Sequence, residues 1–365
     1  MDSFFALPAK EQVLLLNEAA KRHGHISNKI VEKDFWIYWT LKQLFENYKI
    51  APYIVFKGDT SLSKAYNLIN RFSENIDLEI DKNPLNLSVD GGDRMRKDIH
   101  NASPYLRNIF ENQSTSLLNT SWLPLLNKQF SEVLASKNSN LSIHDGDWSL
   151  TISPKDSHII LFHYPQVISY GIRSSEARDL DHIKPVIRLK FSTRGDIFSA
   201  TTRSFIPYVM EFLPEIFNDH ICAKITTTTL EAEYTFWDKV AILHCLYIQP
   251  QNKMLKASMA QHYYDIIMLA RKGIAINALH RRDLLEVVTK NSRFEYTEPI
   301  NSIIYQAYDD LLQHNIKLVP VADNITYLKN DYLTMQKNGM FFGDFPSFTE
   351  IIKELKELEH ILNNN

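Results

Sequence analysis

Apolar and polar positions alternate most clearly in the stretch 53–81, which predicts two strands joined by a turn and a helix. Residues 53–56 form a short apolar run typical of a buried strand, and 62–69 place apolar residues at helical spacing. The residues around Asp77 and Glu79 then alternate strictly, so that apolar side chains leave one face of a strand and carboxylates leave the other. We expect the rest of the fold to be built around this unit.

The same spacing rules predict the remaining elements. Helices are expected at 7–23, 29–48, 103–137, 205–217, 233–248, 257–272, 298–315, 325–336 and 347–362. Further strands are expected at 148–153, 157–164 and 184–193, with a β-prone run at 226–229. The predicted class is therefore α+β, with a mixed α/β domain and its N-terminal helices at 1–205, followed by a helical domain at 206–365.

Composition is that of an ordinary globular protein. Of the 365 residues, 44% are hydrophobic and 23% are charged, and only 10 are Gly and 14 Pro, which argues against long flexible linkers. The net charge of −3 provides no overall field for nucleic acid, so any RNA contact requires a local basic patch. The sequence shows no secretory signal and no apolar run near the ~20 residues of a membrane span, so a cytoplasmic protein without membrane contact is expected.

The carboxylates of the second strand suggest metal chemistry. Asp77 and Glu79 leave the same face, and a divalent cation would relieve the repulsion between them. The turn at Gly58 opens a helix, and free N–H groups at helix N-termini bind phosphate. A phosphate-binding turn followed by a strand of carboxylates predicts a nucleotide-and-metal site.

Two groups of motifs resemble a known family. The first comprises Lys57, Gly58, Thr60, Ser61, Leu62, Lys64, Arg71, Phe72, Ser73, Glu74, Ile76, Asp77 and Leu78. The second comprises Thr235, Phe236, Trp237, Lys239, Leu243, His244, His262, Tyr263, Tyr264 and Asp265. Together they resemble the nucleotidyltransferase superfamily that includes DNA polymerase β and, more closely, the AbiEii/AbiGii toxin family.

The resemblance implies both a fold and a function. The fold would be a polymerase β-like mixed sheet with flanking helices and a C-terminal helical domain. The protein would be the toxin of a toxin–antitoxin (abortive infection) system, with a cognate antitoxin as partner. It would transfer NMP from an NTP to an RNA acceptor, such as a tRNA 3′ end, with Mg²⁺ or Mn²⁺.

The resemblance also implies which residues perform the reaction. Asp77 would hold the metal ion together with Glu79 or Asn75, and the sequence leaves both alternatives open. Lys239 would bind the triphosphate from the helical domain. Asp265 would orient Lys239 or the acceptor hydroxyl.

Four residues around the turn would bind the nucleotide. Gly58 and Ser61 would support the phosphates from the turn. Lys57 begins the motif, and Lys64 would neutralise phosphate charge.

The chain departs from the family pattern at positions that concern charge. Asp59 replaces the second glycine, Asn75 replaces the first Asp of Asp-x-Asp, and Lys190 stands where the family usually has Glu. Gln261 replaces an Arg before His262. These departures leave open a second hypothesis, in which a catalytically degenerate protein of this fold binds nucleotide or a partner without turnover.

The predicted strand at 184–193 has a basic face. Arg188, Lys190 and Arg194 share this face, which would suit triphosphate or RNA backbone. The alternative is a solvated edge strand whose lysine and arginine side chains prevent pairing with other chains.

Overall fold

The computed structural model describes residue 4 and residues 7–24, 26–81, 104–136, 147–168, 183–193, 199–217, 224–249, 255–295 and 302–364. Arg194 of the predicted basic face lies outside these residues. Within them, no helix combines the length and the apolar character that crossing a membrane requires.

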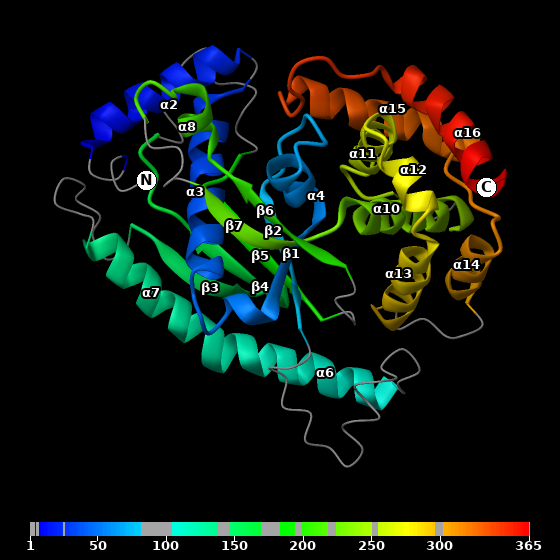
Figure 1. The fold of residues 1–365 in the computed structure, drawn as a ribbon, viewed down its shortest axis with the longest axis horizontal. Helices are drawn as coiled ribbons and strands as arrows, with labels where there is room; N and C mark the ends of the chain where they lie inside the picture. The colour runs from blue at the N-terminus through cyan, green and yellow to red at the C-terminus, as the bar shows by residue number, and fades with distance from the viewer. Residues whose placement is uncertain are drawn as a thin grey trace.

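A mixed seven-stranded sheet, whose strands lie between residues 54 and 230, forms the centre of the N-terminal part of the chain (Figure 1). Its strand order is β3-β4-β5-β2-β1-β7-β6. The strands are β1 (Ile54–Lys57), β2 (Asn75–Ile80), β3 (Ser149–Ser153), β4 (Asp156–His163), β5 (Val186–Ser192), β6 (Ala200–Phe205) and β7 (Ile225–Leu230). β2 runs antiparallel to β1 and parallel to β5, and β1 runs parallel to β7. The predicted α+β class is confirmed.

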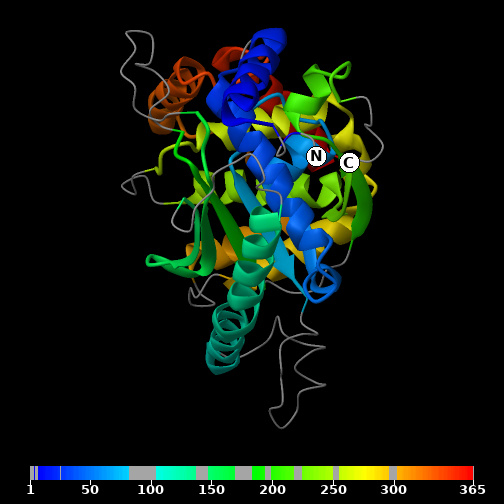
Figure 2. The same ribbon diagram turned by 90° about the vertical axis from the view of Figure 1, so that its left-hand side faces the viewer.

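Helices cover the sheet and form a separate layer beside it. The helices that come before β7 in the chain are α2 (Ala9–His23), α3 (Asn28–Phe45), α4 (Gly58–Thr60), α6 (Pro104–Leu117), α7 (Leu123–Ser136) and α8 (Tyr208–Phe212). Those of the second half are α10 (Ala232–Ile248), α11 (Ala260–Arg271), α12 (Ile274–Leu279), α13 (Arg282–Glu295), α14 (Ile303–Leu312), α15 (Ala322–Lys337) and α16 (Phe348–Asn364). Figure 1 shows α10 to α16 together on one side of the sheet, and Figure 2 shows α6 projecting beyond the rest of the molecule.

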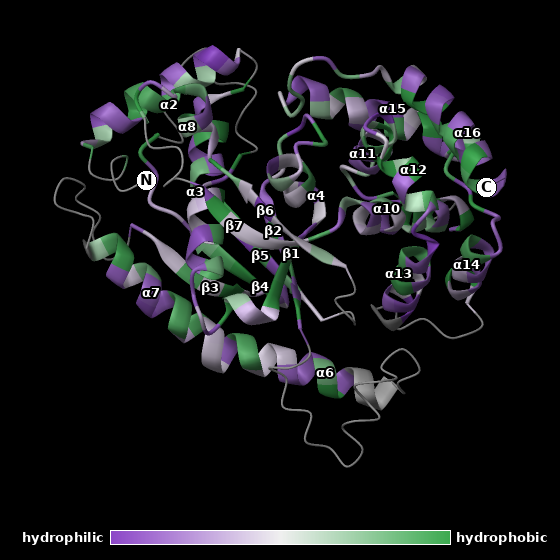
Figure 3. Ribbon diagram, viewed as in Figure 1, coloured by the Kyte–Doolittle hydropathy of each residue, from purple (hydrophilic) through white to green (hydrophobic). Residues whose placement is uncertain are grey.

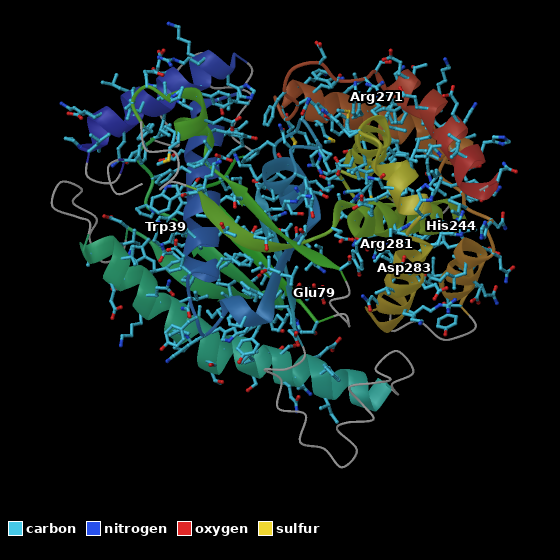
Figure 4. All side chains as sticks on the ribbon, in the orientation of Figure 1. Trp39, Glu79, His244, Arg271, Arg281 and Asp283 are labelled. Carbon is cyan, nitrogen blue, oxygen red and sulfur yellow. The ribbon has the colours of Figure 1, made fainter. Side chains whose placement is uncertain are left out.

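The apolar face of the sheet packs against α3 and α7. Ile76, Leu78 and Ile80 of β2 are fully buried on this face, as their alternation predicts. Trp39 of α3, labelled in Figure 4, stacks on Phe162 of β4 with ring centroids 5.6 Å apart. Helices such as α2, α7 and α16 carry both hydrophilic and hydrophobic residues, as amphipathic packing requires (Figure 3).

The opposite face of the sheet is polar and is turned toward the helical half. The side chains of Val55 and Leu62 pack in the hydrophobic core that α10, α11 and α16 form. The backbone also crosses between the halves, because Phe72 N donates to Met340 O at 2.8 Å and Phe342 N donates to Asn70 O at 2.8 Å. These contacts fix the position of the helical layer over the carboxylate face of β2.

Several elements differ from the sequence predictions. The sheet continues past the expected domain boundary at residue 205, since β7 ends at Leu230. A strand, β6, occupies 200–205, and α8 fills only the middle of the helix expected at 205–217. The helix predicted at 62–69 is shorter and begins earlier. It is the π-helical stretch Ser61–Ala65, which directly follows α4. Neither α12 nor α13 was predicted from the sequence.

β5 is a central strand. It pairs with β2 on one side and β4 on the other, so the edge-strand explanation of its basic face is wrong. Arg188 lies beside Asn75 and Lys190 lies beside Asp77 in the parallel register. The basic residues of β5 therefore lie directly next to the acidic strand.

Candidate active site

Asp77 lies at the point where strands and turn meet. Its register partners are Lys57 on β1 and Lys190 on β5. Its carboxylate is 3.8 Å from Lys190 Nζ, and the Asp77 side chain keeps 26% of its surface exposed. Asp77 is therefore an accessible carboxylate held between two lysine-bearing strands.

Gly58 allows the turn to pass close to Asp77. It has a φ of 76°, in the left-handed region that favours glycine, and a Cβ built on it would lie 2.9 Å from Asp77 Oδ2. The absence of a side chain at residue 58 thus sets how near the turn approaches the carboxylate.

Gly58→Ala is expected to lower by about a hundredfold any activity that depends on the position of the Asp77 carboxylate, because the new methyl group displaces that carboxylate. Gly24→Ala is the matched control, since Gly24 has a φ of 82° but no atom within 4 Å of its built Cβ. Both variants should lose about 1–2 kcal/mol of unfolding free energy in urea titrations. Equal activity in the two variants would contradict the role of this contact.

Glu79 leaves the same face as Asp77 but has its own partners. Its Oε2 accepts from Lys57 Nζ, and Ser192 Oγ donates to the same oxygen at 2.8 Å. The Glu79 side chain is only 8% exposed. Figure 4 labels Glu79 at the sheet. The lysine predicted to bind nucleotide and the second carboxylate predicted to bind metal are thus engaged with each other.

A buried network of two acids and two bases joins the halves of the chain. Arg71 donates from Nε to Asp265 Oδ1 at 2.6 Å and from Nη2 to Asp265 Oδ2 at 2.7 Å. Its Nη2 also donates to Asp59 Oδ2 at 2.6 Å. Lys239 Nζ lies 2.5 Å from Asp59 Oδ1 and 2.7 Å from Asp265 Oδ2. The formal charges of these four side chains cancel.

The network fixes the charge states of its members. Burial alone would raise the pKa of Asp59, but Lys239 and Arg71 outweigh it and hold that pKa well below its ordinary value. Burial would likewise lower the pKa of Lys239, but Asp265 and Asp59 raise it above its ordinary value. Asp59 is therefore a carboxylate and Lys239 an ammonium at neutral pH.

His262 lies beside this network. Its Nδ1 is buried and has no hydrogen-bond partner. Burial and the charge of Lys239 lower the pKa of His262 to about 4, with Asp59 and Asp265 opposing the shift. The imidazole is consequently neutral at pH 7.

Acidification should destabilise the protein through His262. The unfolded chain takes up a proton near pH 6.5 but the folded chain only near pH 4, so stability falls as pH decreases through that interval. We expect a loss of about 2 kcal/mol between pH 7 and pH 4.5 that is absent in His262→Gln. Urea unfolding of both proteins at the two pH values measures it, and an equal loss in both would contradict the assignment. Asp59 adds nothing here, because its contribution is lost only below the ordinary pKa of Asp.

One cleft brings residues of the site together. It has a volume of about 860 Å³, within the range of small-molecule sites. Gly58, Asp77 and Lys190 line it from the sheet, and Lys239 and His262 line it from α10 and α11. Residues distant in the chain thus meet around a space large enough for a nucleotide.

Two residues predicted to bind nucleotide are not brought to this cleft. Ser61 is fully buried, and its hydroxyl donates to Gly58 O at 2.7 Å within the turn. Lys64 Nζ pairs with Asp34 Oδ1 at 2.7 Å and lies 3.4 Å from the centre of the Tyr208 ring, beside a different cavity. The π-helical stretch that contains both residues directs their side chains away from Asp77.

Two further residues of the site received no role from the sequence. Arg71 belongs to the first motif, and His262 precedes Asp265 by three positions. An arginine and a histidine inside motifs otherwise rich in predicted site residues were the available signals. Their partners could not be identified without the fold.

The oxygen donors near Asp77 fit a single divalent cation. Asn75 shares the face of Asp77, lines the cleft, and has a buried side-chain oxygen that accepts no hydrogen bond. Asp59 and Glu79 each contact a lysine, Lys239 and Lys57 respectively. Within the described ranges, no group of three or more His, Cys, Asp or Glu side chains is arranged to hold a metal ion. Substrate phosphates and water commonly complete the ligand shell of Mg²⁺, so a carboxylate and an amide oxygen such as those of Asp77 and Asn75 are candidate ligands for one ion.

Comparisons with known proteins agree with the motifs. The family model "Nucleotidyl transferase AbiEii toxin, Type IV TA system" matches residues 39–354. Among solved structures, the chain is similar to MenT4, a nucleotidyltransferase toxin from Mycobacterium tuberculosis H37Rv, with 13% identity and a TM-score of 0.39 over 96% of this chain and 98% of that chain. No curated protein gives a significant match.

Proposed function

Because this chain belongs to the AbiEii family of nucleotidyltransferase toxins of type IV toxin–antitoxin systems, we propose that its cleft transfers NMP from an NTP to an RNA acceptor such as a tRNA 3′ end. The observation that carries the proposal is that Asp77 and Lys239, from opposite halves of the chain, line one cleft. Its substrates would be found in the cytoplasm, where we propose that the protein acts and where its antitoxin would be made.

Lysines of the cleft would bind the triphosphate. Lys190 lines it from β5, Lys239 from α10 and Lys256 from the segment before α11, so positive charge comes from three parts of the chain. A phosphate chain needs such spread positive charge, because its negative charge is distributed over several oxygens. Lys57 lines the cleft as well, although Glu79 already neutralises it.

Asp77 and Asn75 would hold the divalent ion. When bound, Mg²⁺ or Mn²⁺ would neutralise charge on the phosphates of the substrate. The Asp77 carboxylate and the Asn75 amide oxygen would fix its position relative to Gly58. This assigns the second metal-facing position to Asn75 and gives Glu79 the separate task of holding Lys57 on the neighbouring strand.

The remaining residues would position the reactants. In the transfer, the acceptor hydroxyl oxygen bonds to the α-phosphorus and gives up its proton to water, while the bond from that phosphorus to the oxygen bridging it to the β-phosphate breaks and pyrophosphate leaves. Positioning and electrostatic stabilisation supply most of the rate in such reactions. Asp265, fully buried and bonded to both Arg71 and Lys239, would hold Lys239 toward the cleft.

A second function is nucleotide binding without turnover. The specific observation in its favour is that Asp59 of the turn and Glu79 of β2 are each paired with a lysine. Asp77 would then be the one β2 carboxylate within reach of the substrate, with half the charge of the Asp-x-Asp pattern. This protein would bind NTP in the same cleft and release it unchanged.

Label transfer separates the two functions. The protein is incubated with Mg²⁺ or Mn²⁺, total RNA and each NTP in turn, labelled at either the α- or the γ-phosphate. Transfer predicts that α-label enters RNA while γ-label does not, and that EDTA abolishes the signal. Saturable NTP binding without label in any RNA would support the second function and contradict the first.

A further inference from the structure

Asp59 occupies the cationic groups that face the cleft. Its two carboxylate oxygens contact the Lys239 ammonium at 2.5 Å and the Arg71 guanidinium at 2.6 Å. Among the four side chains of the network it is the exposed member, at 21%, compared with 3% for Lys239 and less for the other two. Asp59 therefore forms the surface of the network where it meets the cleft.

The network does not need Asp59 to pair its bases. Asp265 alone accepts two bonds from Arg71 and one from Lys239. Without Asp59 the three remaining side chains would carry a net charge of +1, at the place where the cleft begins. Asp59 reduces that charge to zero.

The contacts of Asp59 are those of a phosphate. A lysine ammonium and one arm of an arginine guanidinium are the side-chain groups that most often bind phosphate oxygens. Asp59 follows Gly58 directly and lines the cleft together with it and Lys239. A carboxylate at this position satisfies the donors that an anionic ligand in the cleft would otherwise use.

We propose that Asp59 is a built-in competitor for the phosphates of the nucleotide, and that it sets the affinity of the cleft by keeping Lys239 and Arg71 neutralised until a phosphate displaces it. The inference rests on the proposed function only for the identity of the anion. Lys239 exchanges a carboxylate for a phosphate oxygen on binding, so part of the interaction with the ligand replaces an existing one.

Binding measurements on two variants test the competition. Asp59→Asn keeps the shape and removes the charge, and Asp59→Gly removes the side chain. We expect both to bind inorganic triphosphate, in EDTA, about tenfold more tightly or better than the unaltered protein by isothermal titration calorimetry, because a competing charge at contact distance is removed. The gain should shrink as salt is raised.

Asp156→Asn is the matched control. Asp156 lines the same cleft from β4 and is about half exposed, and its Oδ1 lies 3.8 Å from His158 Nδ1. Removing its charge should change triphosphate affinity less than about twofold, since an exposed charge is screened by solvent. Thermal unfolding of each variant checks folding, and Asp59→Asn decides the result if Asp59→Gly does not fold.

The outcomes distinguish this inference from the proposed function. Unchanged or weaker triphosphate binding in Asp59→Asn overturns the inference. So does a loss of NTP binding that occurs only with Mg²⁺, which would make Asp59 a metal ligand. If the variants bind triphosphate more tightly and no protein transfers label, the inference is supported and the proposed transferase function is contradicted. If the unaltered protein transfers label and the variants gain no triphosphate affinity, the transferase function is supported and the inference is contradicted.

Discussion

Asp77→Asn is expected to lower nucleotidyl transfer at least about a thousandfold, equivalent to roughly 4 kcal/mol of transition-state stabilisation. Asp77 is the β2 carboxylate that lines the cleft, and Gly58 and Lys190 hold its position. An amide of the same size cannot supply the negative charge that a divalent cation needs. The fold should change little, because the side chain is partly exposed and its contact with Lys190 is long.

Single-turnover transfer assays with saturating NTP measure this effect. Asp156→Asn should transfer at nearly the unaltered rate, because it removes a carboxylate from the same cleft without touching β2. Melting temperatures should agree among the three proteins. A transfer rate for Asp77→Asn within tenfold of the unaltered protein would remove Asp77 from the reaction.

Arg71→Met should destabilise the protein by about 3–5 kcal/mol, because it leaves a buried acid without its main partner. Asp265 is fully buried and loses the two-point contact with the guanidinium, and Lys239 alone must then serve both Asp265 and Asp59. The free energy of unfolding from urea titration measures the cost.

Arg281→Met is the matched control for this loss. Arg281 also pairs with two acids, Glu231 and Asp283, but its side chain is 39% exposed (Figure 4 labels it in the helical half). Its replacement should cost less than about 1 kcal/mol. Adding Asp265→Leu to Arg71→Met should recover part of the loss, because the Lys239–Asp59 pair remains neutral by itself. Equal costs for the two arginine substitutions would contradict the importance of the buried network.

Local pattern predicted the parts of the site that lie close together in the chain. The alternation around Asp77 placed the carboxylates of β2 on one face and its apolar residues in the core, and both features are present in the structure. The turn at Gly58 was also evident, since glycine followed by small polar residues favours tight turns.

Pairing between distant segments could not be predicted from spacing. Nothing in the sequence of β5 shows that it lies between β2 and β4, and the polar residues 201–204 of β6 lack the alternation that indicates a strand. Lys239 and Asp265 were found through family resemblance. Their contacts with Asp59 depend on how α10 and α11 pack over the sheet.

Side-chain direction within the turn was likewise hidden. A regular helix after Gly58 would suggest that the Lys64 side chain lies beside the bound phosphates. Lys64 instead belongs to the π-helical stretch and pairs with Asp34. Asp59 illustrates the same limit. Its sequence position indicated a negative charge near phosphate, but only the fold shows that Lys239 and Arg71 neutralise it.

A crystal structure with Mn²⁺ and a non-hydrolysable NTP analogue tests the central claim most directly. We expect an anomalous peak for Mn²⁺ about 2.2 Å from an Asp77 oxygen, and phosphate oxygens in contact with the Lys239 ammonium. A nucleotide bound in the cavity beside Lys64 and Tyr208, or a metal ion remote from Asp77, would contradict it.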